Sequence, residues 1–479
     1  MRLFWVVACA QLFVAAAFDV ANTPRLKETE LGGVSDAPSN DSQPKRISGF
    51  FKLNRTVDAH MFYFLFESRS MQASDPVVLW MTGGPGCSSE LAVFVENGPW
   101  HVKDDLTLVE TPYGWDVSNT MIFVDQPINT GFSYSSDDRD RVYDEDKVAD
   151  DMMDFLQELY QAHPELAGRD FYVTGESYAG HYVPAVTHAV WKAKEAGKLK
   201  AEINLKGFAI GNGLTDPAIQ YGAYGDFSLA NDLIDKDTYD NVMWYYPSCK
   251  KAIDVCNGHG WAAECKLAMS FCQVGIVNRI MSAAGNFNVY DIRLPCKGPL
   301  CYDFSRVDDF LNLPSTREWL GVGDAKWEEC DMSVHNDMMG DWMRDYATLL
   351  PPMLESGVRG LIYAGDQDFI CNWMGNARWV DALEWSRAAA YNRTEAVEHS
   401  IDGEPAWAER TSGPLTFLRV YGAGHMVPMD KPKQAMAMID RFTRGEPFSV
   451  PAGSGVSGER LIAKWADVRR TGPFTTNDL

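Results

Sequence analysis

Unbroken apolar runs recur along the chain, and polar or glycine-rich stretches separate them. The runs occupy residues 62–66, 77–81, 121–124, 171–173, 208–210, 360–363 and 417–420. A run that is apolar throughout is typical of a strand buried on both faces of a parallel sheet. Helical apolar spacing over residues 147–161 predicts a covering helix. The pattern therefore predicts an α/β protein with a mixed, mostly parallel central sheet flanked by helices.

Between residues 216 and 342 this strand pattern fades, while cysteines and aromatic residues become dense. We interpret the segment as a helical cap insertion stapled by disulfides. It divides the core into a first part, residues 43–215, and a second part, residues 343–450. Residues 451–479 begin with a stretch that contains Gly453, Gly455 and Gly458, and they are expected to form an exposed C-terminal tail.

The N-terminal residues have the features of a signal peptide. Arg2 precedes an apolar run, and Ala15 and Ala17 form a small-x-small pattern, so we expect a signal peptide over residues 1–17. The run is too short to span a bilayer comfortably and no later stretch is expected to do better, so we expect no membrane contact after cleavage. Residues 18–42 are polar and are interpreted as a leader or short propeptide.

The charge balance is strongly acidic. Lys and Arg number 43 against 66 Asp and Glu, a formal net charge of -23. Such a surface repels phosphate backbones, so nucleic acid is excluded as a partner. The charge suits an acidic compartment, where partial protonation of carboxyl groups relieves self-repulsion, and it equally suits plain solubility.

Nine cysteines follow the signal peptide, an odd number that leaves one thiol free if the others form disulfides. Spacings of 7, 9 and 7 residues suggest two nested bridges, although sequence alone leaves the pairing open; the four cysteines are Cys249, Cys256, Cys265 and Cys272. Zinc is disfavoured because no C-x-x-C pair is present, and we expect no metal or cofactor. Glycosylation sequons begin at Asn40, Asn54 and Asn392.

A nucleophile-elbow pattern surrounds Ser177. The sequence Gly-Glu-Ser-Tyr-Ala-Gly over residues 175–180 follows an apolar run and precedes a helical stretch. A serine on such a tight strand-to-helix turn points outward, and only small neighbours fit the close packing. Ser177 is therefore the candidate nucleophile.

A serine hydroxyl needs a base, and the base needs an acid that orients it. On an α/β-hydrolase fold these residues follow the serine in the order acid, then histidine. His425 comes just after the run 417–420 and a Gly-Ala-Gly turn, so it is the candidate base. Asp366 and Asp368 both follow the run 360–363, and the residues alone leave both open as the acid.

An oxyanion intermediate needs backbone N–H donors. The glycine-rich turn 82–86 follows the strand-like run 77–81 and is expected to supply one of them. The amide of Tyr178, directly after the nucleophile, is expected to supply the second. A phosphate-binding loop is disfavoured because the turn lacks a Lys-Ser or Lys-Thr ending.

Motifs in this order resemble the serine carboxypeptidase family, in particular its carboxypeptidase Y-like branch and plant-type relatives. The similarity extends over about residues 49–444 and includes VLW (78–80), GGPGCSS (83–89), FVDQP (123–127), GFSY (131–134), GESYAGHY (175–182), IGNG (210–213), GDQDFICNW (365–373) and GHMVP (424–428). The resemblance implies the α/β-hydrolase fold and a triad of Ser177, Asp368 and His425. It also implies Gly84 and Tyr178 as the oxyanion donors.

The resemblance further implies that Glu96 and Glu176 bind the free C-terminal carboxylate of a peptide, with at least one of them protonated. Thr82 stands where many members have asparagine, so its shorter hydroxyl is expected to take that donor's place. Losing one donor costs on the order of 1–3 kcal/mol of binding. Cys371 and Met426 are expected to border the substrate subsites.

For the cysteines, the resemblance implies the nested pairs Cys249–Cys272 and Cys256–Cys265, together with Cys296–Cys301 and Cys87–Cys330. Cys371 then remains as the free thiol. The four implied pairs and the free Cys371 together account for all nine cysteines after the signal peptide.

These residues predict a serine-type carboxypeptidase that releases C-terminal residues from peptides through an acyl-enzyme, with an acidic pH optimum. Alternatives are an acyltransferase or esterase on the same scaffold, against which Glu176 argues, and a protective binding partner. We expect peptide substrates, a monomer or homodimer, and passage through the secretory pathway to a vacuole or lysosome, or alternatively secretion.

Overall fold

The computed structural model describes residues 26–31, 43–298 and 300–449. The expected signal peptide, most of the leader, the tail 451–479 and the sequon at Asn40 lie outside these residues. The expectation that the folded part begins near residue 43 is wrong. Residues Leu26–Glu30 form strand β1, which pairs antiparallel with β2. This edge strand, LKETE, is polar, so it contains no apolar run from which a strand could be predicted.

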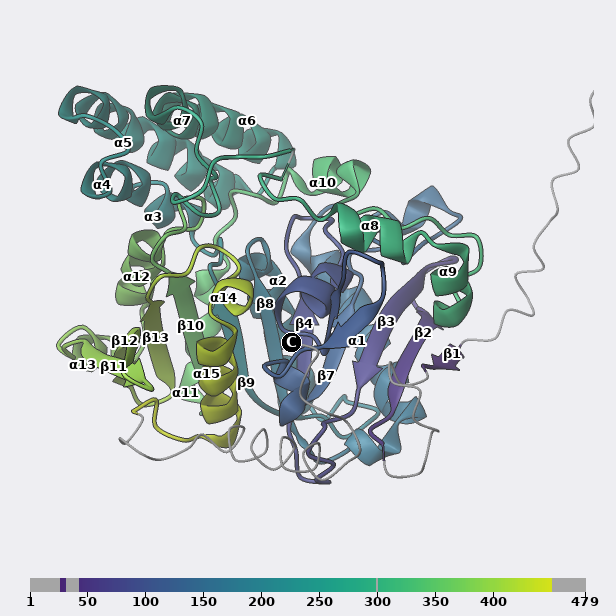
Figure 1. Cartoon of the computed structure of the whole chain (residues 1–479). Coiled ribbons are helices and arrows are strands. Elements are labelled where there is room, and N and C mark those ends of the chain that lie inside the picture. The colour runs from purple at the N-terminus through teal and green to yellow at the C-terminus, as the bar shows by residue number, and fades with distance from the viewer. Residues whose placement is uncertain (1–25, 32–42, 299, 450–479) are drawn as a thin grey trace, which may run out of the picture.

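An eleven-stranded sheet crosses the described part of the chain in the order β1-β2-β3-β7-β4-β8-β9-β10-β13-β12-β11 (Figure 1). The six strands from β7 to β13 are parallel, and the strands on both flanks pair antiparallel. This arrangement confirms the mixed sheet with a parallel centre. Parallel neighbours bring their carboxyl ends to one edge of the sheet, where loops that follow different strands meet.

Each predicted apolar run lies within a strand of this sheet. The strands are β2 (Arg46–Lys52), β3 (His60–Phe66), β4 (Val77–Met81), β7 (Thr120–Val124), β8 (Asp170–Glu176), β9 (Asn204–Gly211), β10 (Arg359–Gly365), β11 (Val397–Ile401), β12 (Glu404–Ser412) and β13 (Leu415–Val420). A separate pair contains β5 (Trp100–Val102) and β6 (Leu108–Glu110). The flanking strands β2, β11 and β12 were not predicted.

Alternate residues of one central strand belong to two different hydrophobic cores. Leu79 of β4 packs in the core beneath α1 (Glu145–Ala162), α2 (Ala179–Glu195) and α11 (Leu350–Glu355). Val78 and Trp80 pack in the core on the opposite face, which α15 (Pro432–Arg444) covers. The unbroken apolar runs thus serve both faces, and α1 confirms the helix predicted over residues 147–161.

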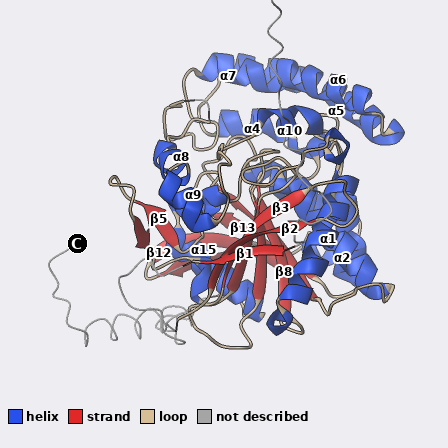
Figure 2. Cartoon of the chain, turned by 90° about the vertical axis from the view of Figure 1, so that its right-hand side faces the viewer, coloured by secondary structure: helices blue, strands red, loops and turns tan. Residues whose placement is uncertain are grey.

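Helices gather above the carboxyl edge of the sheet (Figures 1 and 2). They are α3 (Pro217–Gln220), α4 (Ala223–Ala230), α5 (Lys236–His259), α6 (Ala262–Cys272), α7 (Asn278–Ala284), α8 (Ser305–Leu311), α9 (Pro314–Leu320) and α10 (Met332–Met338). After β10 come α12 (Trp373–Ala382), α13 (Ala388–Tyr391) and α14 (Val427–Asp430). Short π-helical or 3₁₀ turns are η1 (Ala92–Glu96), η2 (Trp115–Val117), η3 (Asp138–Asp140), η4 (Pro164–Leu166), η5 (Gln273–Val277) and η6 (Ala347–Leu349).

The helical stretch Ala262–Ala284 is long and apolar enough to cross a membrane by length and composition alone. The sequence expectation that no stretch after the signal peptide is comparable is therefore wrong. Its cysteines Cys265 and Cys272 are buried and bonded to α5, so one side of the stretch packs against protein. Length and composition are weak evidence for a span, because core helices of soluble proteins meet the same criteria.

Candidate active site

Ser177 lies on a sharp turn between β8 and α2. Its φ is 67°, in the left-handed region that residues with a side chain rarely adopt. Its amide donates to the carbonyl of Gly211 at 3.1 Å, and its carbonyl accepts from Gly180 at 2.9 Å. A Cβ at Gly175 would lie 2.5 Å from the Met81 carbonyl oxygen, so the turn has no room for a larger residue there. The local backbone therefore holds Ser177 in a strained, outward turn.

His425 and Asp368 meet at the same edge of the sheet. The loop after β13 carries His425, and its Nδ1 lies 2.8 Å from Oδ2 of Asp368, in the loop after β10. Both side chains are buried, and Nε2 of His425 has no hydrogen-bond partner among the described residues. An imidazole held through Nδ1 has Nε2 left to accept a proton.

Asp366, the other candidate acid, points to a different partner. Its Oδ1 accepts from the amide of Gly422 at 2.9 Å, and its Oδ2 lies 3.5 Å from Arg419. It therefore fastens the turn after β13, while Asp368 contacts the histidine. Two carboxylates that the residues alone left as equal candidates have separate positions in the fold.

Asn212 was not assigned a role from sequence. Its Nδ2 donates to Oδ2 of Asp368 at 2.8 Å, and its Oδ1 accepts from the amide of Gly365 at 3.1 Å. The amides of Ile370 and Cys371 donate to Asp368 at 3.1 and 3.2 Å. Asp368 thus has several donors besides His425. The available signal was an asparagine between glycines directly after a parallel strand.

The glycine-rich turn after β4 lies against the elbow. A Cβ built on Gly83 would be 2.4 Å from the amide nitrogen of Tyr178 and 2.8 Å from Cβ of Ser177. Gly84 has a φ of 111°, which favours glycine. Within the described ranges, the amides of Gly84 and Tyr178 donate to no backbone or side-chain acceptor. Two N–H groups are therefore free beside the serine.

Glu96 and Glu176 form a buried pair of carboxyl groups in hydrogen-bonding contact. Burial raises the pKa of Glu96 to about 8. Burial, together with the charge of Glu96, raises the pKa of Glu176 well above its usual range. Glu176 directly precedes Ser177 in the chain, and its charge interacts with that of Asp368, so the carboxyl pair lies near the candidate triad.

Thr82 is buried at the start of the glycine-rich turn. Its Oγ1 accepts from Nε1 of Trp80 at 3.0 Å, and its amide donates to Oγ of Ser89 at 3.1 Å. Because the hydroxyl oxygen accepts from the indole, the hydroxyl hydrogen remains available to a ligand.

The candidate subsite residues Cys371 and Met426 are 6% and 8% exposed. Burial raises the pKa of the Cys371 thiol well above its usual range, so the thiol is the stable form. Its backbone amide donates to Asp368 at 3.2 Å, so the residue lies beside the candidate acid, with its side chain buried. Met426 immediately follows His425 and precedes α14.

The cysteines pair as the resemblance implies. Disulfides join Cys87–Cys330, Cys249–Cys272, Cys256–Cys265 and Cys296–Cys301, and Cys371 is the free cysteine among the described residues. The first bridge joins the glycine-rich turn to the segment before α10. At the two described sequons, the side chains of Asn54 and Asn392 are exposed, as an acceptor requires.

One further buried group lies near the elbow. Ligand-type atoms of Glu145, His181 and Asp341 lie within 4.8 Å of one another, and all three residues are buried. Their spacing alone permits a cation, and among the described residues no other group of this kind is present. None of the three residues was assigned a role from sequence.

Comparison with known proteins places this geometry in context. The sequence model of the family described as serine carboxypeptidase matches residues 38–445. Serine carboxypeptidase 3 of Oryza sativa subsp. japonica is 49% identical over 399 residues, 83% of this chain and 79% of that protein. Serine carboxypeptidase-like 48 of Arabidopsis thaliana is 47% identical over 441 residues, 90% and 86% of the two chains.

A solved structure has the same fold. The crystal structure of a prohormone-processing carboxypeptidase from Saccharomyces cerevisiae aligns with a TM-score of 0.78 at 26% identity. The alignment covers 87% of this chain and 96% of the yeast chain.

Proposed function

The chain belongs to the serine carboxypeptidase family, and on that premise we propose that it releases C-terminal residues from peptides through an acyl-enzyme formed on Ser177. Nε2 of His425 takes the hydroxyl proton as Oγ attacks the carbonyl carbon of the last peptide bond. Asp368 orients the imidazole through Nδ1 and stabilises the positive charge that the ring acquires.

The carbonyl oxygen becomes an oxyanion in this step. The free amides of Gly84 and Tyr178 are the donors that stabilise it. His425 then gives its proton to the leaving amino group, the C–N bond breaks, and the acyl group stays on Ser177. Water, deprotonated by the same imidazole, attacks the acyl carbon, and the proton finally returns to Oγ of the serine.

The buried Glu96–Glu176 pair is the observation that carries the exopeptidase assignment. A protonated carboxyl group donates a hydrogen bond to a peptide's terminal carboxylate, whereas an ionised one repels it. The hydroxyl of Thr82 is a further donor. An esterase or acyltransferase that accepts neutral alcohol groups has no need of such a pair. The pair therefore favours a peptidase over these alternatives.

The raised pKa values of this pair support an acidic working range. Below the raised pKa values the pair holds its protons and binds the terminal carboxylate. As the pH rises toward about 8, Glu96 loses its proton and the carboxylate of the substrate meets negative charge. Binding is therefore expected to weaken on the alkaline side.

The test compares an N-blocked dipeptide with its C-terminal amide at acidic pH, with Ser177→Ala as the control for catalysis. We expect release of the free amino acid from the dipeptide, a much higher KM for the amide, and no turnover by the variant. Preferred transfer of an acyl group from an activated ester to an added alcohol, with little release from the dipeptide, would favour the acyltransferase instead. Co-purification with another enzyme and no turnover would favour the protective partner.

We propose an oxidising compartment of the secretory pathway as the location, because four disulfides persist there and not in the cytosol. A vacuole or lysosome fits the acidic working range, and secretion is the alternative. Whether the enzyme is a monomer or homodimer is measured by sedimentation of the glycosylated protein.

A further inference from the structure

Two further buried carboxyl groups lie next to the turn that carries Gly84. We call residues 82–89 the oxyanion turn. Glu90 directly follows this turn, and Asp125 directly follows β7. The two residues are 1% and 0% exposed, and their carboxyl groups are in hydrogen-bonding contact. Two ionised carboxylates buried in contact repel each other, so one of the two groups has to hold a proton.

Backbone amides surround the carboxyl group of Asp125. Its Oδ1 accepts from the amide of Ser89 at 3.0 Å, and its Oδ2 accepts from the amide of Phe132 at 2.7 Å. A Cβ built on Gly131 would lie 2.1 Å from Oδ2, so only glycine lets the loop after β7 close around this group. Because a backbone N–H can only donate, both oxygens of Asp125 act as acceptors.

The carboxyl group of Glu90 has its donors on one side. Among the described residues, both hydrogen bonds that side chains donate to it go to Oε2, from the hydroxyl of Ser88 and, at 3.2 Å, from Nε1 of Trp327. Oε1 is left for the contact with Asp125, whose oxygens are acceptors. A proton on Oε1 of Glu90 therefore satisfies both groups, and without it two acceptors would face each other.

The pKa shifts of the two groups favour the same distribution of charge. Burial and the charge of Asp125 raise the pKa of Glu90 well above its usual range. Burial also raises the pKa of Asp125, while hydrogen bonds from Glu90 and from the amide of Phe132 lower it. A neutral Glu90 beside an ionised Asp125 follows from these opposed effects.

We propose that Glu90 is a neutral acid that donates a hydrogen bond to Asp125, and that this pair positions the oxyanion turn and with it the amide of Gly84. The proposal rests on the function proposed above only for the role of that amide. Glu90 and Asp125 are positioning residues, because they act through the backbone of the turn.

An unbroken series of hydrogen bonds joins the acid pair to the start of the oxyanion turn. Asp125 binds the amide of Ser89, and Oγ of Ser89 accepts from the amide of Thr82 at 3.1 Å. The same Oγ donates to the carbonyl of Val124 at 2.7 Å, which fixes its direction. Gly84 lies between Thr82 and Ser89, so the direction of its N–H depends on where Asp125 holds Ser89.

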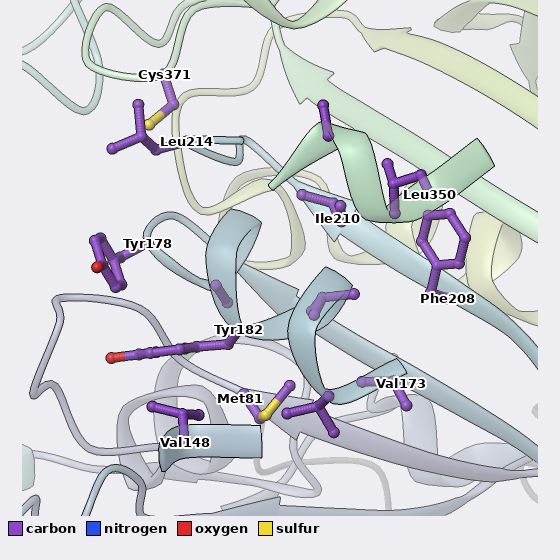
Figure 3. Close-up of a cluster of buried hydrophobic side chains, with 14 of the residues drawn as sticks. Met81, Val148, Val173, Tyr178, Tyr182, Phe208, Ile210, Leu214, Leu350 and Cys371 are labelled. Carbon is purple, nitrogen blue, oxygen red and sulfur yellow. The ribbon is translucent and has the colours of Figure 1, made fainter. Parts of the chain in front are cut away.

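Different interactions anchor the two ends of the oxyanion turn. Met81, directly before the turn, packs in a buried cluster with Val173 and Tyr182 (Figure 3). At the other end the contacts are polar, and Nε1 of Trp327 also donates to Oγ of Ser88 at 2.9 Å. Hydrogen bonds have narrower ranges of distance and angle than apolar contacts, so the polar end sets the direction of the turn.

The test replaces Glu90 and Asp125 of the full-length enzyme, each by its amide counterpart. The amide group of Glu90→Gln donates to Asp125, and its carbonyl accepts from Trp327, as the neutral acid does. Asp125→Asn instead turns an NH₂ group toward a backbone amide that needs an acceptor. We therefore expect unequal effects from the same chemical change.

Two rates are measured at acidic pH, on variants that circular dichroism shows to be folded: kcat/KM on a blocked dipeptide, and inactivation of Ser177 by a phosphonofluoridate. Inactivation requires the nucleophile and the oxyanion donors but no terminal carboxylate, so it remains informative if the proposed peptidase function fails. The urea midpoint is measured alongside. Asp151→Asn is the matched control, because Asp151 is a buried carboxyl of α1 that pairs with Lys147 instead.

Glu90→Gln should keep both rates within about threefold of wild type, whereas Glu90→Leu and Asp125→Asn should lower them by about 10–100-fold, since a misplaced oxyanion donor weakens transition-state binding. Ser89→Ala keeps the amide that binds Asp125 but removes the acceptor of the Thr82 amide. It should lower both rates by about 3–30-fold. Asp151→Asn should have the wild-type rates.

Equal losses from Glu90→Gln and Glu90→Leu would mean that Glu90 acts as an anion, against the proposal. A wild-type rate for Asp125→Asn would place the proton on Asp125 and equally contradict it. Lower urea midpoints with unchanged inactivation rates would reduce the pair to a structural role and overturn the positioning role. If Glu90→Leu and Asp125→Asn do not fold, a wild-type inactivation rate for Ser89→Ala refutes the connection between Asp125 and the turn.

Discussion

The parallel centre of the sheet and the helices α5 to α7 are stabilised in different ways. Strand β4 is wholly buried, and alternate residues serve cores on both faces. The helices, in contrast, expose large apolar side chains to solvent: Trp244 is 78% exposed, Leu267 71% and Val274 61%. Two disulfides, between cysteines that are 23 and 9 residues apart in the sequence, join α5 to α6. Burial stabilises the first region, and covalent bonds supplement weak burial in the second.

The proposed catalytic groups also belong to the first region. The elbow, Asp368 and His425 follow buried parallel strands. Glu176 is the last residue of β8, and Glu96 is the last residue of the turn η1. Positioning groups within a fraction of an ångström requires a scaffold without alternative packings.

The largest expected effect concerns the triad acid. Asp368→Asn should lower kcat on the order of 10⁴-fold, because an asparagine can fix the wrong tautomer of His425. The neighbouring Asp366→Asn is the matched control, since Asp366 binds Gly422 instead. Steady-state kinetics on one dipeptide distinguish them, and equal losses would contradict separate positions for the two aspartates.

The second largest effect is expected from a substitution that leaves a cavity in the central sheet. Leu79→Ala is expected to lower the free energy of unfolding by about 2–5 kcal/mol, because Leu79 is fully buried and its site cannot collapse. Denaturation in urea measures the change. A loss below about 1 kcal/mol would mean that the central sheet is no more tightly packed than the helices.

Removing one disulfide should destabilise the helices α5 and α6 but leave kcat nearly unchanged. Replacing both Cys256 and Cys265 by alanine should cost about 2–3 kcal/mol, from the chain entropy of a loop of that length. Local proteolysis and hydrogen exchange should increase in α5 and α6 while kcat at low temperature stays near wild type. An equal increase of exchange in β4 and β8 would show that the two regions unfold together.

The pH dependence of KM and of stability should come in part from Glu96, at the edge of the sheet. Glu96 has a folded-state pKa of about 8 against 4.5 unfolded, so its stabilising contribution is complete below about pH 4.5 and is lost as the pH rises through 8. The KM of the wild type is expected to rise about tenfold per pH unit above about pH 8, and Glu96→Gln should flatten that rise. Unchanged pH profiles of KM and of urea midpoint would refute this assignment.

The smallest effect is expected on the exposed helices. Leu267→Ala should change the free energy of unfolding by less than about 0.5 kcal/mol, because the side chain already faces water. The comparison with Leu79→Ala uses the same chemical change at opposite exposures. A loss as large as at Leu79 would show that a neighbouring surface covers Leu267 in solution.

Local pattern predicted much of the fold. Every predicted apolar run lies inside one of the strands β3, β4, β7, β8, β9, β10 and β13. The flanking strands β1, β2, β11 and β12 were missed. Of these, β1 and β11 are edge strands, which are held mainly by backbone pairing that their polar side chains do not reveal. Ser177 was predictable because the elbow is a local motif in which small residues allow one sharp turn.

The sequence by itself thus determined the buried strands, the serine's turn and, through its motifs, the family. The residues alone left Asp366 and Asp368 open, and the family resemblance implied Asp368. Only the tertiary structure showed the contact of Asp368 with His425, placed Asn212 at that aspartate, and brought Asp341 to His181 across 160 residues. The physical reason is range. Apolar periodicity records what each residue needs from its own strand or helix. Hydrogen bonds between distant side chains, in contrast, depend on the order in which parallel strands bring their loops to one edge.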